Sequence, residues 1–163
     1  MIRVFVIVAA LACWAAAALP ASAAKTPRDL WATVNICDTP LHENMMGVRA
    51  SIPGDGDHTK MYMRFTAQYY DRSRQVWSSV KENGVSNWIY VGSGIYASRQ
   101  GGYTFAFTAP GAGKTFVLRG GVDFRWTKRG RTVRTAHVVT KGGHPRTTGA
   151  DPESYSASLC EIK

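Results

Sequence analysis

The stretch Phe116-Val117-Leu118-Arg119-Gly120-Gly121-Val122-Asp123-Phe124-Arg125-Trp126 indicates the fold class of this 163-residue chain. Large apolar side chains alternate along it with polar ones. The apolar positions are Phe116, Leu118, Val122, Phe124 and Trp126, and the polar ones are Arg119, Asp123 and Arg125, followed by Thr127 just after the stretch. A two-residue period is typical of a β-strand that buries one face. The stretch therefore predicts a strand with an apolar inner face and a charged outer face.

A hairpin is predicted to follow this strand directly. If Arg129-Gly130 forms a two-residue turn, Trp126 lies opposite Val133 and apolar residues meet on the inner face. The same register places Arg125 opposite Arg134 on the outer face. It also turns His137 inward, opposite Val122.

Further short alternating segments occur along the chain, separated by Gly, Pro and Asn turn signals, and no long helical period competes with them. The predicted strands are Trp31 to Cys37, Met46 to Ile52, Met61 to Tyr70, Gln75 to Val80, Trp88 to Val91, Tyr103 to Thr108, Thr132 to Val139 and Tyr155 to Ile162. Short strands at this spacing predict an all-β protein, an antiparallel β-sandwich of about seven to nine strands.

The N-terminus has the pattern of a bacterial secretory signal peptide. Arg3 precedes an apolar run of 16 residues from Val4 to Leu19, and Ala21-Ser22-Ala23-Ala24 offers a small-residue cleavage site. The run is shorter than the roughly 20 residues that span a bilayer. We therefore expect residues 1–24 to be removed. Residues 25–163 then form one secreted domain, with no transmembrane segment after cleavage.

Cleavage would leave two of the three cysteines. Cys13 is lost with the signal peptide, so Cys37 and Cys160 are the only possible intramolecular pair, and an even count in an exported chain predicts a disulfide. Cys37 alternates with Thr33 and Asn35 rather than with the apolar Val34. We therefore expect the disulfide to join the first and last strands near one end, rather than to pin the two sheets through the core.

The Trp126 hairpin, followed by Asp151-Pro152-Glu153-Ser154-Tyr155 and then Cys160, resembles the later strands of immunoglobulin-like sandwiches. In that group an acid four residues before a tyrosine often marks a tyrosine corner. The spacing from Tyr155 to Cys160 is five residues rather than two, and the first tryptophan after Cys37 is the distant Trp77. The chain also resembles exported bacterial sandwich proteins without characterised activity. This resemblance implies an Ig-like fold and transfers no functional residue.

Positive charge is concentrated in one region. The chain carries a formal charge of +9, and residues 119–146 contain eight Lys or Arg residues and one acid, for a net +7. For an exported protein the available partners include anionic envelope polymers. The predicted binding residues are those of the basic hairpin, Arg119, Arg125, Arg129, Arg131 and Arg134.

Other motifs predict no cofactor and no metal site. Gly111-Ala112-Gly113-Lys114-Thr115 lacks the first glycine of a phosphate loop and precedes a strand, so we expect a hairpin turn and no nucleotide. Asp55-Gly56-Asp57 begins like a calcium loop, but Lys60 and Thr66 occupy positions that need glycine and glutamate. The four histidines have no metal-ligand spacing.

The sequence therefore predicts a secreted, non-catalytic binding or envelope-associated module. Its expected partner is an anionic cell-envelope polymer or another extracellular protein. Two alternatives stay open. One is a hydrolase whose site leaves no sequence signature, and the other is a protein inhibitor that presents an exposed loop, such as 81–87 or 141–151.

Overall fold

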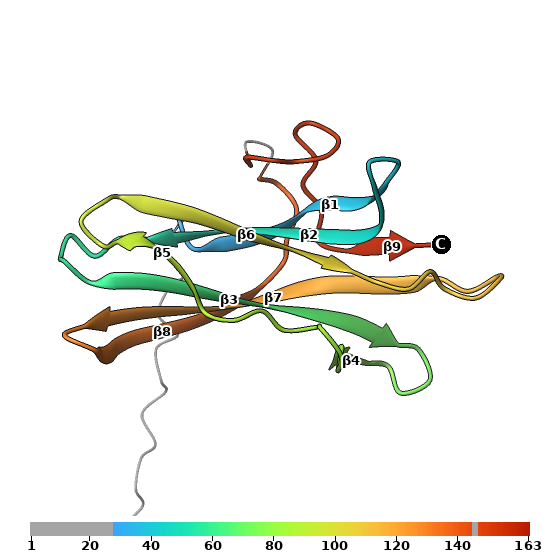
Figure 1. Ribbon diagram of the computed structural model, residues 1–163, viewed down its shortest axis with the longest axis horizontal. Helices are drawn as coiled ribbons and strands as arrows, with labels where there is room; N and C mark the ends of the chain where they lie inside the picture. Colours follow the sequence, from blue (N-terminus) through green and yellow to red (C-terminus); the bar gives the residue numbers. More distant parts are fainter. Residues whose placement is uncertain (1–27, 145–146) are drawn as a thin grey trace, which may run out of the picture.

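The computed structural model describes residues 28–144 and 147–163. The predicted signal peptide, with Cys13, lies outside the described residues. The described chain contains nine strands and is all-β (Figure 1). The strands are β1 (Trp31–Thr39), β2 (His42–Pro53), β3 (Lys60–Asp71), β4 (Val76–Ser79), β5 (Ile89–Ser93), β6 (Ser98–Ala106), β7 (Phe116–Lys128), β8 (Arg131–Val139) and β9 (Cys160–Ile162). Every predicted strand coincides in part with an observed one, although the last begins at Cys160 rather than Tyr155.

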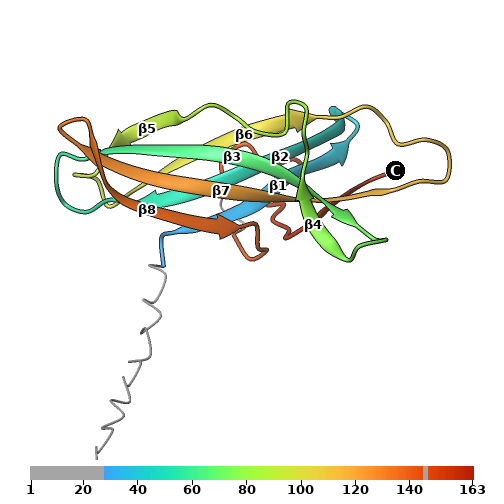
Figure 2. The ribbon, with the colours of Figure 1, turned by 90° about the horizontal axis from the view of Figure 1, so that it is seen from below.

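The strands form two antiparallel sheets that lie face to face (Figures 1 and 2). One sheet has three strands in the order β1-β2-β6. The other has six, with β4-β3-β7-β8 in order, β5 beside the beginning of β3 and β9 beside the beginning of β7. This arrangement confirms the all-β, antiparallel prediction. It also makes β3 and β7 the central strands of the larger sheet.

The core lies between the sheets and consists of the alternating apolar residues that the sequence predicted. Trp126, Phe124, Phe65 and Met46 are fully or almost fully buried. The indole Nε1 of Trp126 donates a hydrogen bond of 3.0 Å to the carbonyl oxygen of Pro53, so its buried polar group is satisfied. Because one face of β3 and β7 is used in this way, their other face projects away from the core.

The β7–β8 hairpin has the predicted two-residue turn but a different register. Arg129 and Gly130 have φ of 51° and 78°, as a tight hairpin turn requires. Beyond the first two residue pairs after the turn, a β-bulge interrupts the pairing. Trp126 therefore lies opposite Arg134 rather than Val133. The predicted pairing of Arg125 with Arg134 is therefore wrong, since Arg125 pairs with Thr135.

The same bulge corrects the prediction for His137. An extra residue in one strand moves every later side chain of that strand to the other face. His137 consequently lies opposite Asp123 on the outer face, and not inward opposite Val122.

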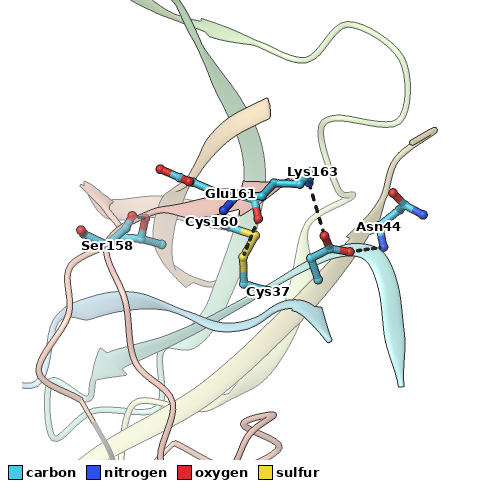
Figure 3. Close-up of a disulfide and its surroundings, with 8 residues drawn as sticks. Cys37, Asn44, Ser158, Cys160, Glu161 and Lys163 are labelled. Atoms are coloured by element: carbon cyan, nitrogen blue, oxygen red, sulfur yellow. Dashed lines mark hydrogen bonds between the residues drawn. A yellow bond between two sulfur atoms is a disulfide. The ribbon is translucent and has the colours of Figure 1, made fainter. Parts of the chain in front are cut away.

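A second irregularity positions the disulfide. Cys37 and Cys160 are bonded, as predicted, and the bond joins β1 to β9, the first and last strands (Figure 3). The register of β1 shifts between Val34 and Ile36, so Cys37 lies opposite Met46. Strict alternation placed Cys37 on the outer face. Because of the shift, the disulfide instead joins the three-stranded sheet to the six-stranded one.

The segment before β9 lies along the free edge of β1. The backbone of Val34 exchanges two hydrogen bonds with Ala157, and the amide of Asn35 donates to Gly149 O at 2.8 Å. Tyr155 packs against the core, which raises the pKa of its hydroxyl through burial. Asp151, the acid of the predicted tyrosine corner, contacts Thr39 and His42 instead. The described part of the chain contains no helix long and apolar enough to cross a membrane.

Candidate binding face

The outer face of the six-stranded sheet gathers arginine and aromatic side chains from strands far apart in the sequence. On β3 and β7, the residues between the buried ones point outward, and β4 and the Trp88–Tyr90 segment add aromatic rings at either end. We call this surface the arginine–aromatic face (the strands that form it are seen in Figure 2). Its residues are Tyr62, Arg64, Tyr70, Trp77, Trp88, Tyr90, Arg119, Asp123, Arg125 and His137.

Each arginine of this face lies against an aromatic ring. The guanidinium carbon of Arg125 is 4.1 Å from the ring centre of Trp88, and that of Arg64 is 4.8 Å from the same ring. At the other end, Arg119 lies 4.3 Å from the ring centre of Trp77. Such contacts are cation–π interactions, and they restrict the motion of the guanidinium groups. The positive charges are thus held in place before any ligand arrives.

Asp123 is the acid within this face, and it is already paired. Its carboxylate accepts a hydrogen bond of 2.9 Å from Arg64 and contacts Nδ1 of His137 at 2.7 Å. Burial alone would raise the pKa of Asp123, but the hydrogen bonds from His137 and Arg64 outweigh it and hold the pKa below its usual value. Asp123 therefore stays ionised at neutral pH and offsets one of the three arginine charges.

The two other arginines differ in how their nitrogens are satisfied. Arg119 Nε donates to the side-chain oxygen of Gln68 at 2.8 Å, and burial lowers the pKa of Arg119. Arg125 Nε is buried and, among the described residues, has no hydrogen-bond partner. A buried donor without an acceptor costs about 1–3 kcal/mol. Arg125 therefore keeps one buried donor, Nε, that no described protein group accepts.

The structure separates the five predicted binding residues. Arg119 and Arg125 lie on the arginine–aromatic face, whereas Arg129 and Arg131 are exposed at the tip of the β7–β8 hairpin. Because of the bulge, Arg134 faces the other way and covers Trp126, with its guanidinium carbon 4.5 Å from the ring centre.

Sequence reasoning missed Arg64 and the aromatic partners of the arginines. The alternation of 62–70 placed Arg64 on an outer face, but its position beside Asp123 depends on the pairing of β3 with β7. Trp77 and Trp88 lie on short segments that carry too few residues to define a face by alternation.

Another cluster combines groups that are found in acid–base catalysis. Thr39 donates a hydrogen bond to Asp151, and His42 Nδ1 contacts the same carboxylate at 2.9 Å and Thr39 Oγ1 at 3.4 Å. A catalytic triad needs the acid and the hydroxyl on opposite imidazole nitrogens. Here one nitrogen meets both groups, so the cluster does not form a relay.

In the turn that resembles a calcium loop, both carboxylates already contact other side chains of the protein. Asp55 accepts a hydrogen bond of 2.9 Å from Thr59 Oγ1, and Asp57 pairs with Lys128. Within residues 28–144 and 147–163 there is no group of three or more His, Cys, Asp or Glu residues arranged to hold a metal ion. The Gly111 to Thr115 segment forms a turn in which Lys114 N donates to Gly111 O at 2.9 Å.

Comparison of the chain with protein-family models and with curated proteins gave no match.

Proposed function

We propose that this protein is an exported, non-catalytic binding protein that engages an anionic extracellular polymer through the arginine–aromatic face. Export is supported by the N-terminal pattern of residues 1–24 and by the Cys37–Cys160 disulfide, which is a feature of oxidising compartments. We also propose that the sandwich is Ig-like. This part of the proposal rests on the resemblance of the Trp126 hairpin, Asp151, Tyr155 and Cys160 to the later strands of immunoglobulin-like sandwiches.

The observation that carries the proposal is the row of three aromatic-backed guanidinium groups. Arg119 and Arg125 are six residues apart on β7, a separation of about 20 Å along a strand. Arg64 lies on the neighbouring strand between them. A ligand that meets all three charges must be extended and must carry repeated negative groups. Guanidinium groups suit carboxylate, sulfate and phosphate because their planar N–H donors match these anions in pairs.

The chemistry of the face favours binding over catalysis. The low pKa of Asp123 makes its carboxylate a poor proton acceptor, and both of its oxygens are held by Arg64 and His137. The arginines, in contrast, are constrained by their aromatic neighbours and lose little conformational freedom when an anion binds.

The test is retention of the folded protein on immobilised polygalacturonate and on heparin, eluted with a salt gradient. The variant carries Arg119→Gln and Arg125→Gln. The matched control carries Arg99→Gln and Lys114→Gln, which removes the same charge; Arg99 also lies over an aromatic ring, Tyr96, at 3.7 Å, but on the three-stranded sheet. The proposal predicts elution at clearly lower salt for the first variant only. Equal shifts for the two variants would mean that net charge, and not this face, determines retention.

A further inference from the structure

A groove of about 520 Å³ lies at the open side of the sandwich, between the end of β8 and the beginning of β1. Within the described residues β8 pairs only with β7, so the side of β8 toward the groove is a sheet edge. The groove is within the size range of small-ligand sites. Its lining residues are Arg28, Leu30, Trp31, Ala32, His137, Val138, Val139, Lys141 and His144.

The lining combines a ring platform with positive charge. Trp31 and His144 are stacked with their ring centres 4.4 Å apart and their planes within 12°. Burial lowers the pKa of His144, so its ring is neutral at pH 7 and behaves as a flat aromatic surface. Arg28 and Lys141 are exposed, and the described residues of the lining include no acid. A ligand that suits this lining has an apolar ring face and a negative group beside it.

The groove is continuous with the arginine–aromatic face around the edge of the sheet. His137 lines the groove and also contacts Asp123 on the outer face, at 2.7 Å. A polymer that crosses β7 and continues over β8 therefore reaches the groove. One extended ligand can therefore contact both surfaces through the strip around His137.

We propose that the groove is a subsite for one or a few acidic sugar units of this polymer, a hexuronate or a closely similar carboxylated pyranose, an inference that rests on the function proposed above. Because the two stacked rings cover each other's inner faces, the C–H face of the pyranose ring packs on an outer face of the Trp31–His144 stack through dispersion. The carboxylate faces Arg28 and Lys141, which provide charge-assisted hydrogen bonds. Sheet-edge addition of a peptide is the competing use of this side of β8, and the test below separates the two.

The experiment titrates the folded protein with a galacturonate trimer, which is too short to span the arginine–aromatic face, and measures binding by calorimetry. The neutral galactose trimer is the ligand control. Two groove variants are compared, Lys141→Gln and His144→Ala, together with the control Arg99→Gln, which lies on the three-stranded sheet outside both surfaces. We expect the trimer to bind the native protein and Arg99→Gln equally. We expect up to about fivefold weaker binding for Lys141→Gln, as for loss of one exposed ion pair, and a similar loss for His144→Ala.

The outcomes separate this inference from the proposed function. If the trimer does not bind, or if both groove variants bind it as the native protein does, the subsite is overturned, while polymer retention through Arg119 and Arg125 still stands or falls on its own test. Equal binding of tripolyphosphate, unaffected by His144→Ala, would also overturn it, because the ring platform would then have no role. Binding of an extended acidic peptide in place of the trimer would assign the groove to sheet-edge addition instead.

Discussion

Replacing Asp123 by asparagine should tighten polymer binding while it weakens the fold. The substitution keeps the shape of the side chain and removes the negative charge of the arginine–aromatic face, so the partner of Arg64 at 2.9 Å is no longer an anion. An anion that binds the opposite side of this guanidinium lies about 6 Å from the Asp123 carboxylate, two hydrogen-bond lengths away. Repulsion between unit charges at that distance in water is about 0.7 kcal/mol, and salt at 0.15 M reduces it by about half.

This magnitude corresponds to about threefold tighter binding at low salt and about twofold at physiological salt. Stability should fall because the ion pair with Arg64 loses its charge and the contact with His137 loses its carboxylate. The side chains of Arg64 and His137 are 41% and 53% exposed, so the loss is expected at the low end of about 0.2–1 kcal/mol for one exposed pair. Fluorescence anisotropy with labelled polygalacturonate measures the affinity, and urea unfolding measures the stability.

The matched control is Glu153→Gln, an exposed acid outside the arginine–aromatic face whose removal changes the net charge equally. It should leave the affinity almost unchanged. Unchanged or weaker binding by Asp123→Asn, or an equal gain with Glu153→Gln, would refute the reasoning that the polymer lies on this face.

Three further predictions concern the disulfide, the hairpin register and acid sensitivity. Replacing Cys37 and Cys160 by serine removes a cross-link between two residues 123 positions apart in the sequence. Urea unfolding should show that the free energy of unfolding falls by up to about 5 kcal/mol, and a fall below 1 kcal/mol would contradict this prediction. Arg125→Ala should weaken binding to polygalacturonate, whereas Arg134→Ala should not, since the bulge puts Arg134 over Trp126; similar losses would contradict the observed register. Hydrogen bonds from Thr39 and His42 hold the pKa of Asp151 below its usual value. The stability that this carboxylate adds is therefore complete above its unfolded pKa of about 3.9 and is lost as the pH falls through the lower folded pKa. Asp151→Asn should thus be less stable than the native chain at pH 6, and the difference should shrink as the pH falls below the unfolded pKa. A constant difference would argue against this ionisation.

The sequence was sufficient to predict the strands and the core because alternation is a local signal. Phe65, Val122, Phe124 and Trp126 are buried as their spacing predicts. The disulfide also followed from the sequence, since the number of cysteines left only one pair. These features need no knowledge of which strands are neighbours.

The β-bulges of β1, between Val34 and Ile36, and of β8, beside Trp126, could not be predicted in this way. Each adds one residue to a strand and reverses the side-chain alternation beyond it, and neither the β1 segment nor the β8 segment carries a Gly or Pro that would mark it. Cys37, His137 and Arg134 therefore lie on faces opposite to those predicted. The arginine–aromatic face could not be predicted for another reason. Arg64 and Trp88 come into contact because β3 pairs with β5 and β7, which are distant from it in the sequence.

The most direct test of the central claim is arginine footprinting. Phenylglyoxal modifies accessible guanidinium groups, and mass spectrometry reports the extent at each arginine with and without polygalacturonate. The account predicts that the polymer protects Arg64, Arg119 and Arg125, while Arg99 on the three-stranded sheet reacts as before. Protection confined to the hairpin tip at Arg129, or equal protection of Arg99, would contradict binding at the arginine–aromatic face.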